Sequence, residues 1–256
     1  MAHDLGAEIV SADAFQVYRG LNLLTAKPDA ATLAKVRHHL IGATPLREEM
    51  NAAKFCRAAS RAIDEIQSRG KPAIVVGGSG LYIKALTHGL AVLPEVDPKL
   101  RAKLNALSMD ALRSQLMDFD PETARKIDMN NRRRLVRALE IGLLTDKPAS
   151  IQRNQWAVAA DADRGRPGST IPATGVFVLR DRQELYARIN RRVEAMFENG
   201  VIEEVRAAGK MSSTAAQMIG LHEIRELLDG KISILQCVAA IQQATRRYAK
   251  RQLTWF

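Results

Sequence analysis

Two turns of the chain carry the residues best suited to chemistry. Asp13 ends the short β-rich segment 7–13, and the turn Gly77–Gly80 follows the apolar run 72–76. The Asp13 carboxylate could accept a proton from a nucleophile, and glycines let a backbone approach a bound anion closely. Singly, Asp13 could cap a helix and the glycines could serve tight packing. Together, in an α/β chain, they favour a ligand site.

A second candidate lies on a helix predicted from Gln183. Arg188 and Arg192 are spaced i, i+4 on one face, so two guanidiniums could bind a pyrophosphate or a phosphodiester. Pairing with Glu184 and Glu194 on a solvated helix face explains the same pattern equally well.

Alternating strands and helices would position these residues. The segments 7–13 and 72–76 predict strands, the second an apolar run typical of a strand buried on both faces. Helices are predicted at 51–69, ended by Gly70, and at 81–86. Ligands of parallel α/β sheets lie beyond the carboxyl ends of the strands. We therefore expect both turns at one edge of the sheet.

The middle of the chain has a different pattern of predicted secondary structure. Helical stretches at 98–107, 110–119 and 131–144 are interrupted by prolines, and 161–168 reads as a polar loop. The α/β pattern resumes with a strand at 174–179 and helices at 183–198, 202–208 and 232–252. This predicts an α/β core from 1–88 and 171–256, with a helical insertion at 89–170.

Charge and composition narrow the functional class. The 256 residues carry a net charge of +10, which favours a polyanionic partner. Basic clusters lie at 125–137 and 245–256, although each could be a solvated helix face. No run is apolar enough for a membrane span and no signal pattern opens the chain, so we expect a soluble cytoplasmic protein. Cys56, Cys237 and the five histidines lack metal-ligand spacing, so no protein-only metal site is expected.

Six motifs follow one another along the chain: Ser11–Gly20, Thr25–Pro28, His38–Ile41, Val76–Tyr82, Arg133–Glu140 and Thr245–Phe256. In this order they resemble the bacterial tRNA dimethylallyltransferases, also called tRNA isopentenyl-pyrophosphate transferases. The resemblance implies an α/β core related to P-loop kinases. It also implies transfer of a dimethylallyl group from dimethylallyl diphosphate to N6 of the adenosine 3′ of the tRNA anticodon, assisted by Mg²⁺.

The resemblance also assigns roles to single residues. Asp13 matches the family's proposed base, and Arg192 matches the arginine beside the departing diphosphate. Thr25 and Lys27 belong to the neighbouring loop, and with Arg188 we expect them to contact the diphosphate. The tRNA-facing positions are Asp13, Ala14, Phe15, Gln16, Ser79, Arg101, Arg133, Arg134, Leu135, Val136, Arg137, Gln217, Met218, Ile219, Gly220, Leu221 and His222.

One family feature is missing from these residues. Relatives carry a Gly-x-x-x-x-Gly-Lys-Ser/Thr loop before the first motif, and this sequence has none. We expect a truncated start, and therefore a chain less stable and less active than one with that strand beside 73–76. A non-catalytic RNA-binding remnant and a transferase of free adenine nucleotides are the alternatives, and we expect the protein to be a monomer. The helical insertion with its basic cluster Arg132–Arg137 argues against the nucleotide alternative, since a mononucleotide needs no such surface.

Overall fold

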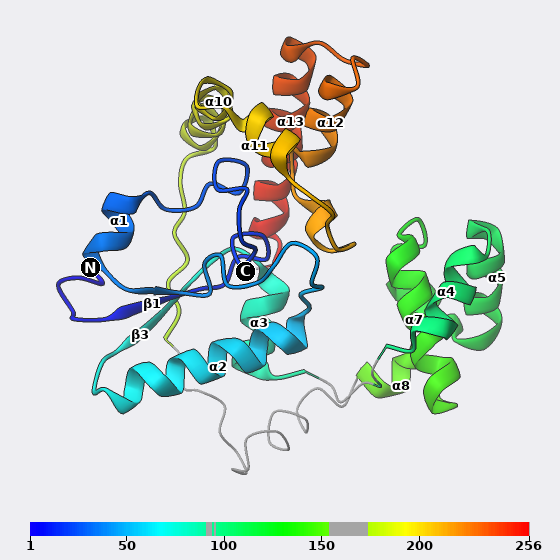
Figure 1. Cartoon of the computed structure of the whole chain (residues 1–256). Coiled ribbons are helices and arrows are strands. Elements are labelled where there is room, and N and C mark those ends of the chain that lie inside the picture. Colours follow the sequence, from blue (N-terminus) through cyan, green and yellow to red (C-terminus); the bar gives the residue numbers. More distant parts are fainter. Residues whose placement is uncertain (91–93, 95, 154–173, 256) are drawn as a thin grey trace. The chain divides into compact units, whose positions relative to one another are not determined.

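The computed structural model describes residues 1–90, 94, 96–153 and 174–255 (Figure 1). The chain divides into two compact units, one of Met1–Leu86 with Ala173–Phe256 and the other of Thr87–Pro172. Each unit is described by itself.

A parallel sheet lies at the centre of the first unit. Its strands β1 (Glu8–Ser11), β2 (His38–His39) and β3 (Ala73–Val76) are ordered β2-β1-β3, with Ile9 opposite both His38 and Ile74. The predicted α/β class with a parallel sheet is confirmed. The expected burial of 72–76 on both faces is wrong, because β3 is an edge strand of the described sheet and Val76 is 51% exposed.

Helix α2 (Ala52–Ser68) packs along β1 and β3 (Figure 1). The Asn51 side chain accepts a hydrogen bond from Lys54 N at its start, and Gly70 adopts a positive φ just beyond its end. Phe55 of α2 stacks on Tyr82 of α3 (Gly80–His88) with ring centroids 4.3 Å apart. This stacking joins the helices that follow β2 and β3.

The C-terminal helices pack on one another (Figure 1). They are α10 (Arg182–Glu198), α11 (Val201–Ala207), the 3-10 turn η1 (Ala215–Gln217), α12 (Leu221–Leu228) and α13 (Ile234–Leu253), while α1 (Ala30–Lys35) lies between β1 and β2 in the chain. Tyr18 is 1% exposed and ties the N-terminal half to these helices, because its hydroxyl bonds Thr214 Oγ1 at 2.6 Å.

The strand predicted at 174–179 is absent. These residues belong to no strand of the described sheet, and Val176 and Val178 are 87% and 76% exposed. β-branched residues favour a strand locally, but a strand forms only with a hydrogen-bonded neighbour. The polar loop predicted at 161–168 lies outside the described residues.

The regular elements in the described residues of the second unit are all helices. It contains α4 (Pro98–Ala106), α5 (Met109–Phe119), α6 (Pro121–Lys126), α7 (Arg132–Thr145) and α8 (Ala149–Arg153). Its core is aliphatic and includes Leu112, Leu116 and Leu135, each fully buried. Glu140 of α7 is also fully buried, and its Oε2 accepts hydrogen bonds from Arg101 and Arg137 at 2.5 and 2.6 Å.

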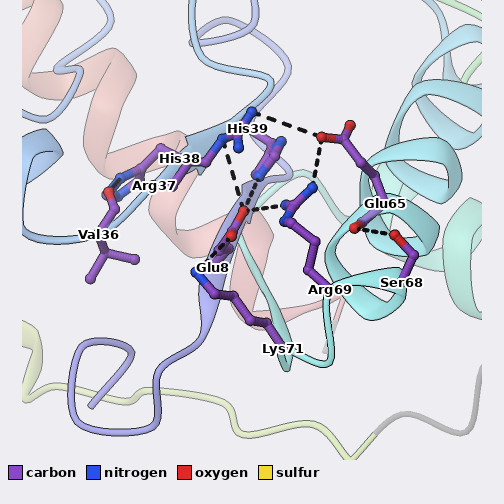
Figure 2. A network of polar contacts seen from close by, with 9 residues as sticks. All are labelled: Glu8, Val36, Arg37, His38, His39, Glu65, Ser68, Arg69 and Lys71. Carbon is purple, nitrogen blue, oxygen red and sulfur yellow. Dashed lines mark hydrogen bonds and ion pairs between the residues drawn. The ribbon is translucent and has the colours of Figure 1, made fainter.

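An ionic network closes the amino end of the sheet (Figure 2). We call it the Glu8 cluster: Glu8, Arg37, His39, Glu65, Arg69 and Lys71. The Glu8 side chain is 4% exposed and lies 2.7 Å from His39 Nε2, 2.8 Å from Arg69 Nη2 and 3.2 Å from Lys71 Nζ. These bonds, led by the one from His39, lower the pKa of Glu8 to about 2.

Candidate active site

A cavity of about 240 Å³ opens at the carboxyl end of the sheet. One part of its lining is apolar and comes largely from α10 and α13. The other part is polar and includes Asp13, Thr25, Arg192, Tyr248 and Gln252. A cavity with an apolar wall and a few convergent polar groups suits a ligand with an apolar body and a charged head.

The turn after β1 fixes the direction of the Asp13 carboxylate. Asp13 Oδ1 accepts hydrogen bonds from Phe15 N at 2.8 Å and Gln16 N at 3.0 Å. Ala14 N donates to Ser79 Oγ at 3.0 Å, which ties this turn to the turn after β3. No hydrogen bond within the described residues uses Asp13 Oδ2, so this oxygen is available to accept a proton.

Arg192 lines the same cavity as Asp13, and their charges interact. Burial lowers the pKa of the Arg192 guanidinium, and the charge of Asp13 opposes that shift; arginine stays charged in either case. Arg192 and Arg188, one turn earlier on α10, are both exposed at the level of the whole residue, but only Arg192 lines the cavity. The two glutamates that could have paired with Arg188 and Arg192 have other partners. Glu184 forms an ion pair with Arg180, and Glu194 accepts a hydrogen bond from Gln242.

The loop Gly20–Lys27, which we call the cavity loop, supplies Leu24, Thr25 and Ala26 to the lining. Gln16 Nε2 donates to the carbonyls of Thr25 and Ala26 at 3.3 and 3.0 Å. The Thr25 hydroxyl donates to Leu21 O at 2.7 Å. Lys27 is not in the lining, and all three of its ammonium donors are bonded within or beside this loop.

The glycines after β3 make room for neighbouring protein atoms. A β-carbon at Gly77 would lie 2.4 Å from the Ala12 backbone, and one at Gly78 would lie 1.9 Å from Gln252 Nε2. At Gly80 it would lie 2.7 Å from the Trp255 ring. This turn is therefore glycine-rich because α13 and β1 pack directly on it.

One face of α13 completes the polar part of the lining, and this contribution was missed by sequence reasoning. Ile241, Thr245, Tyr248 and Gln252 follow at i, i+4, i+7 and i+11 and all line the cavity. Burial raises the pKa of the Tyr248 hydroxyl, which hydrogen-bonds Ser79 and Gln252. Helical periodicity was the signal that could have singled out this face.

The segment 217–222 divides between cavity, core and surface. Met218 and Ile219 line the cavity, whereas Gln217 and His222 are exposed. Gly220 has φ +91, with Leu24 and Ile241 close to where a β-carbon would stand. Leu221 is fully buried, so its side chain offers no surface to a tRNA.

The expected tRNA-facing residues of the second unit likewise divide into exposed and buried ones. Arg133 and Arg134 are exposed, and neither forms an ion pair within the described residues. Arg137 and Arg101 bind the buried Glu140. Leu135 and Val136 belong to the aliphatic core. Only some positions of this motif therefore present an exposed charged side chain.

The described residues contain no group of three or more His, Cys, Asp or Glu side chains that could hold a metal ion. They also contain no helix long and apolar enough to cross a membrane.

Comparison with known proteins gives consistent results over the whole chain. A family model described as IPP transferase matches residues 16–256. The chain is 44% identical to tRNA dimethylallyltransferase 1 of Citrifermentans bemidjiense, with 100% of this chain and 82% of the relative covered. It is also 44% identical to the tRNA dimethylallyltransferase of Akkermansia muciniphila, covering 100% of this chain and 83% of that one.

Two solved structures extend the likeness to the fold. The full-length tRNA isopentenylpyrophosphate transferase from Bacillus halodurans matches with a TM-score of 0.67 and 35% identity, over 100% of this chain and 80% of that one. A eukaryotic dimethylallyltransferase acting on tRNA matches with a TM-score of 0.80 and 26% identity, over 99% of this chain and 64% of that one.

Proposed function

The chain belongs to the IPP transferase family, and from this membership we propose that its cavity binds dimethylallyl diphosphate beside an adenosine of the tRNA anticodon loop. The protein is a tRNA dimethylallyltransferase by its family, and the acceptor proposed here is N6 of the adenosine 3′ of the anticodon. The observation that carries the proposal is the cavity lining, in which Asp13 and Arg192 border an apolar wall.

The chemistry of this transfer fits the two charged groups. N6 attacks the allylic carbon, the bond from that carbon to the diphosphate oxygen breaks, and N6 loses a proton. Asp13 Oδ2 accepts this proton, while Arg192 offsets the charge that develops on the departing diphosphate. The apolar wall, including Ile189 and Met196, holds the dimethylallyl group away from water.

Magnesium fits this site only together with the substrate. Mg²⁺ is usually held by one or two carboxylates and by substrate phosphates rather than by a protein cage. Asp13 is the one carboxylate in the cavity lining of the described residues, so the diphosphate and water must supply the other ligands. When bound, the ion would neutralise diphosphate charge. We further propose that the protein is a monomer and that it acts in the cytoplasm. The positive charges of the exposed Arg133 and Arg134 would attract the tRNA.

Transfer to a synthetic anticodon stem-loop tests this function. The purified protein, with dimethylallyl diphosphate and Mg²⁺, should add one dimethylallyl group to the stem-loop, detected by mass spectrometry. A matched stem-loop with inosine at that position lacks the N6 amine and should remain unmodified. Modification of the inosine stem-loop, or of adenosine monophosphate in preference to the stem-loop, would contradict the proposed acceptor.

A further inference from the structure

The cavity loop has an unusual backbone. Gly20, Leu21 and Ala26 have φ values of +75°, +52° and +49°. Side chains other than glycine rarely adopt this left-handed conformation, since it costs free energy. Leu24, Thr25 and Ala26 nevertheless reach the cavity lining from this loop. Side-chain contacts to the backbone of the loop must therefore hold its shape.

A carboxylate far away in the sequence provides one such contact. Glu204 on α11 accepts hydrogen bonds from Leu23 N at 3.0 and 3.1 Å, one to each oxygen, and from Leu24 N at 3.0 Å. Consecutive backbone N–H groups form an anion-binding concavity, and here the protein's own carboxylate fills it. Glu204 itself does not line the cavity.

An ammonium group provides the second contact. Lys27 Nζ donates to Tyr18 O at 2.5 Å, Gly20 O at 2.6 Å and Asn22 Oδ1 at 3.0 Å. Burial lowers the pKa of Lys27, and the negative charge of Glu204 opposes this shift. The two groups therefore hold the loop together: Lys27 binds its first turn, and Glu204 binds the residues that lead into the lining.

We propose that Glu204 is a positioning residue for dimethylallyl transfer, acting through the backbone of Leu23 and Leu24 with Lys27 as its counterpart. This inference rests on the proposed function. Glu204 keeps Leu24 and Thr25 in the cavity lining. Lys27 supports the same loop, in place of the diphosphate contact expected for it.

Replacement of Glu204 by glutamine tests the role with little change of shape. Glu204→Gln puts an amide N–H₂ group where Leu23 N needs an acceptor, so the loop loosens. We expect kcat to fall between about 10- and 100-fold, the range produced by small misplacements in active sites, with unchanged binding of the anticodon stem-loop. The matched control is Glu203→Gln on the same helix, whose side chain is 66% exposed and lies 3.5 Å from Arg206; it should keep full activity.

Two further measurements separate positioning from general stability. Amide exchange in residues 21–27 should be faster in Glu204→Gln than in the parent. Formate should restore part of the kcat of Glu204→Ala, because it can occupy the position of the missing carboxylate. Chloride at the same concentration should not restore it. An unchanged kcat in Glu204→Gln, or unchanged exchange in residues 21–27, would overturn the proposal. A parent protein without transferase activity would refute the proposed function instead, and the exchange comparison would then decide whether Glu204 holds the loop.

Discussion

At the amino end of the sheet, every oxygen of the Glu8 carboxylate is bonded to a cation, whereas at the carboxyl end Asp13 uses Oδ1 for its own turn and leaves Oδ2 free. Both carboxylates belong to β1 or directly follow it. Satisfied ionic groups fix a structure, because each partner restrains the other. An unsatisfied carboxylate beside a cavity instead remains available to a substrate.

The largest expected effect is on catalysis at the unsatisfied end. Asn at position 13 keeps an oxygen for Phe15 N and Gln16 N but cannot accept a proton from N6. Asp13→Asn should therefore lower kcat by at least about 100-fold, the usual contribution of a general base. Melting temperature and stem-loop affinity should stay close to those of the parent. Retained transfer activity would remove Asp13 from the proton-accepting role.

A change in the Glu8 cluster, at the amino end of the sheet, should instead lower stability and leave kcat unchanged. Glu8→Gln takes the anionic partner from Lys71 and leaves Arg69 with Glu65 alone, and losing one member of a buried ionic group destabilises a protein. We expect a melting temperature lower by several degrees and an unchanged kcat for the folded fraction. Glu65→Gln, at a side chain that is 56% exposed in the same cluster, is the control and should have a much smaller effect. A large loss of kcat in Glu8→Gln would mean that the two ends are coupled.

Acid should abolish the contribution of Glu8. Its folded pKa is about 2, against an ordinary value of 4.5, so folding favours the charged form. The resulting stability is complete above about pH 4.5 and is lost as the pH falls from 4.5 to 2. Urea denaturation of the parent and of Glu8→Gln should therefore differ at about pH 6 and converge towards about pH 2. A constant difference over this range would contradict the assigned cause.

This contrast also explains which features the sequence could predict. Local periodicity identified β1, α2, α10 and α13 to within a few residues, because each has a strong apolar pattern. It failed at 174–179, where a strand depends on a partner elsewhere in the chain. The family resemblance indicated Lys27 as a diphosphate contact, yet its donors bind oxygen atoms within or beside its own loop.

Partners far apart in the chain were beyond sequence reasoning altogether. Glu204 and Leu23 are separated by 181 positions, and nothing in either segment indicates the other. Asp13 and Arg192 were candidates from their own segments and took their roles from a family resemblance, but their shared cavity appears only in the fold. Helical periodicity does distinguish Leu135 and Val136, buried in α7, from the exposed Arg133 and Arg134.

The smallest expected effect concerns the arginines of α7. It tests whether they too divide into residues bonded within the protein and residues available to a ligand. Arg133 and Arg134 are exposed and form no ion pair within the described residues, whereas Arg137 binds the buried Glu140. Replacing Arg133 and Arg134 together by Ala should weaken stem-loop binding and reduce the salt slope by about 0.7 for each phosphate that is no longer neutralised. Arg137→Ala should instead destabilise the helical unit by about 1–3 kcal/mol, because Glu140 keeps only one of its two partners. Binding measured between roughly 50 and 200 mM salt, the range over which such interactions weaken, together with thermal unfolding, separates the two effects. If Arg137→Ala instead reduced the salt slope of stem-loop binding without loss of stability, Glu140 would serve to orient Arg137 towards tRNA rather than to stabilise the core.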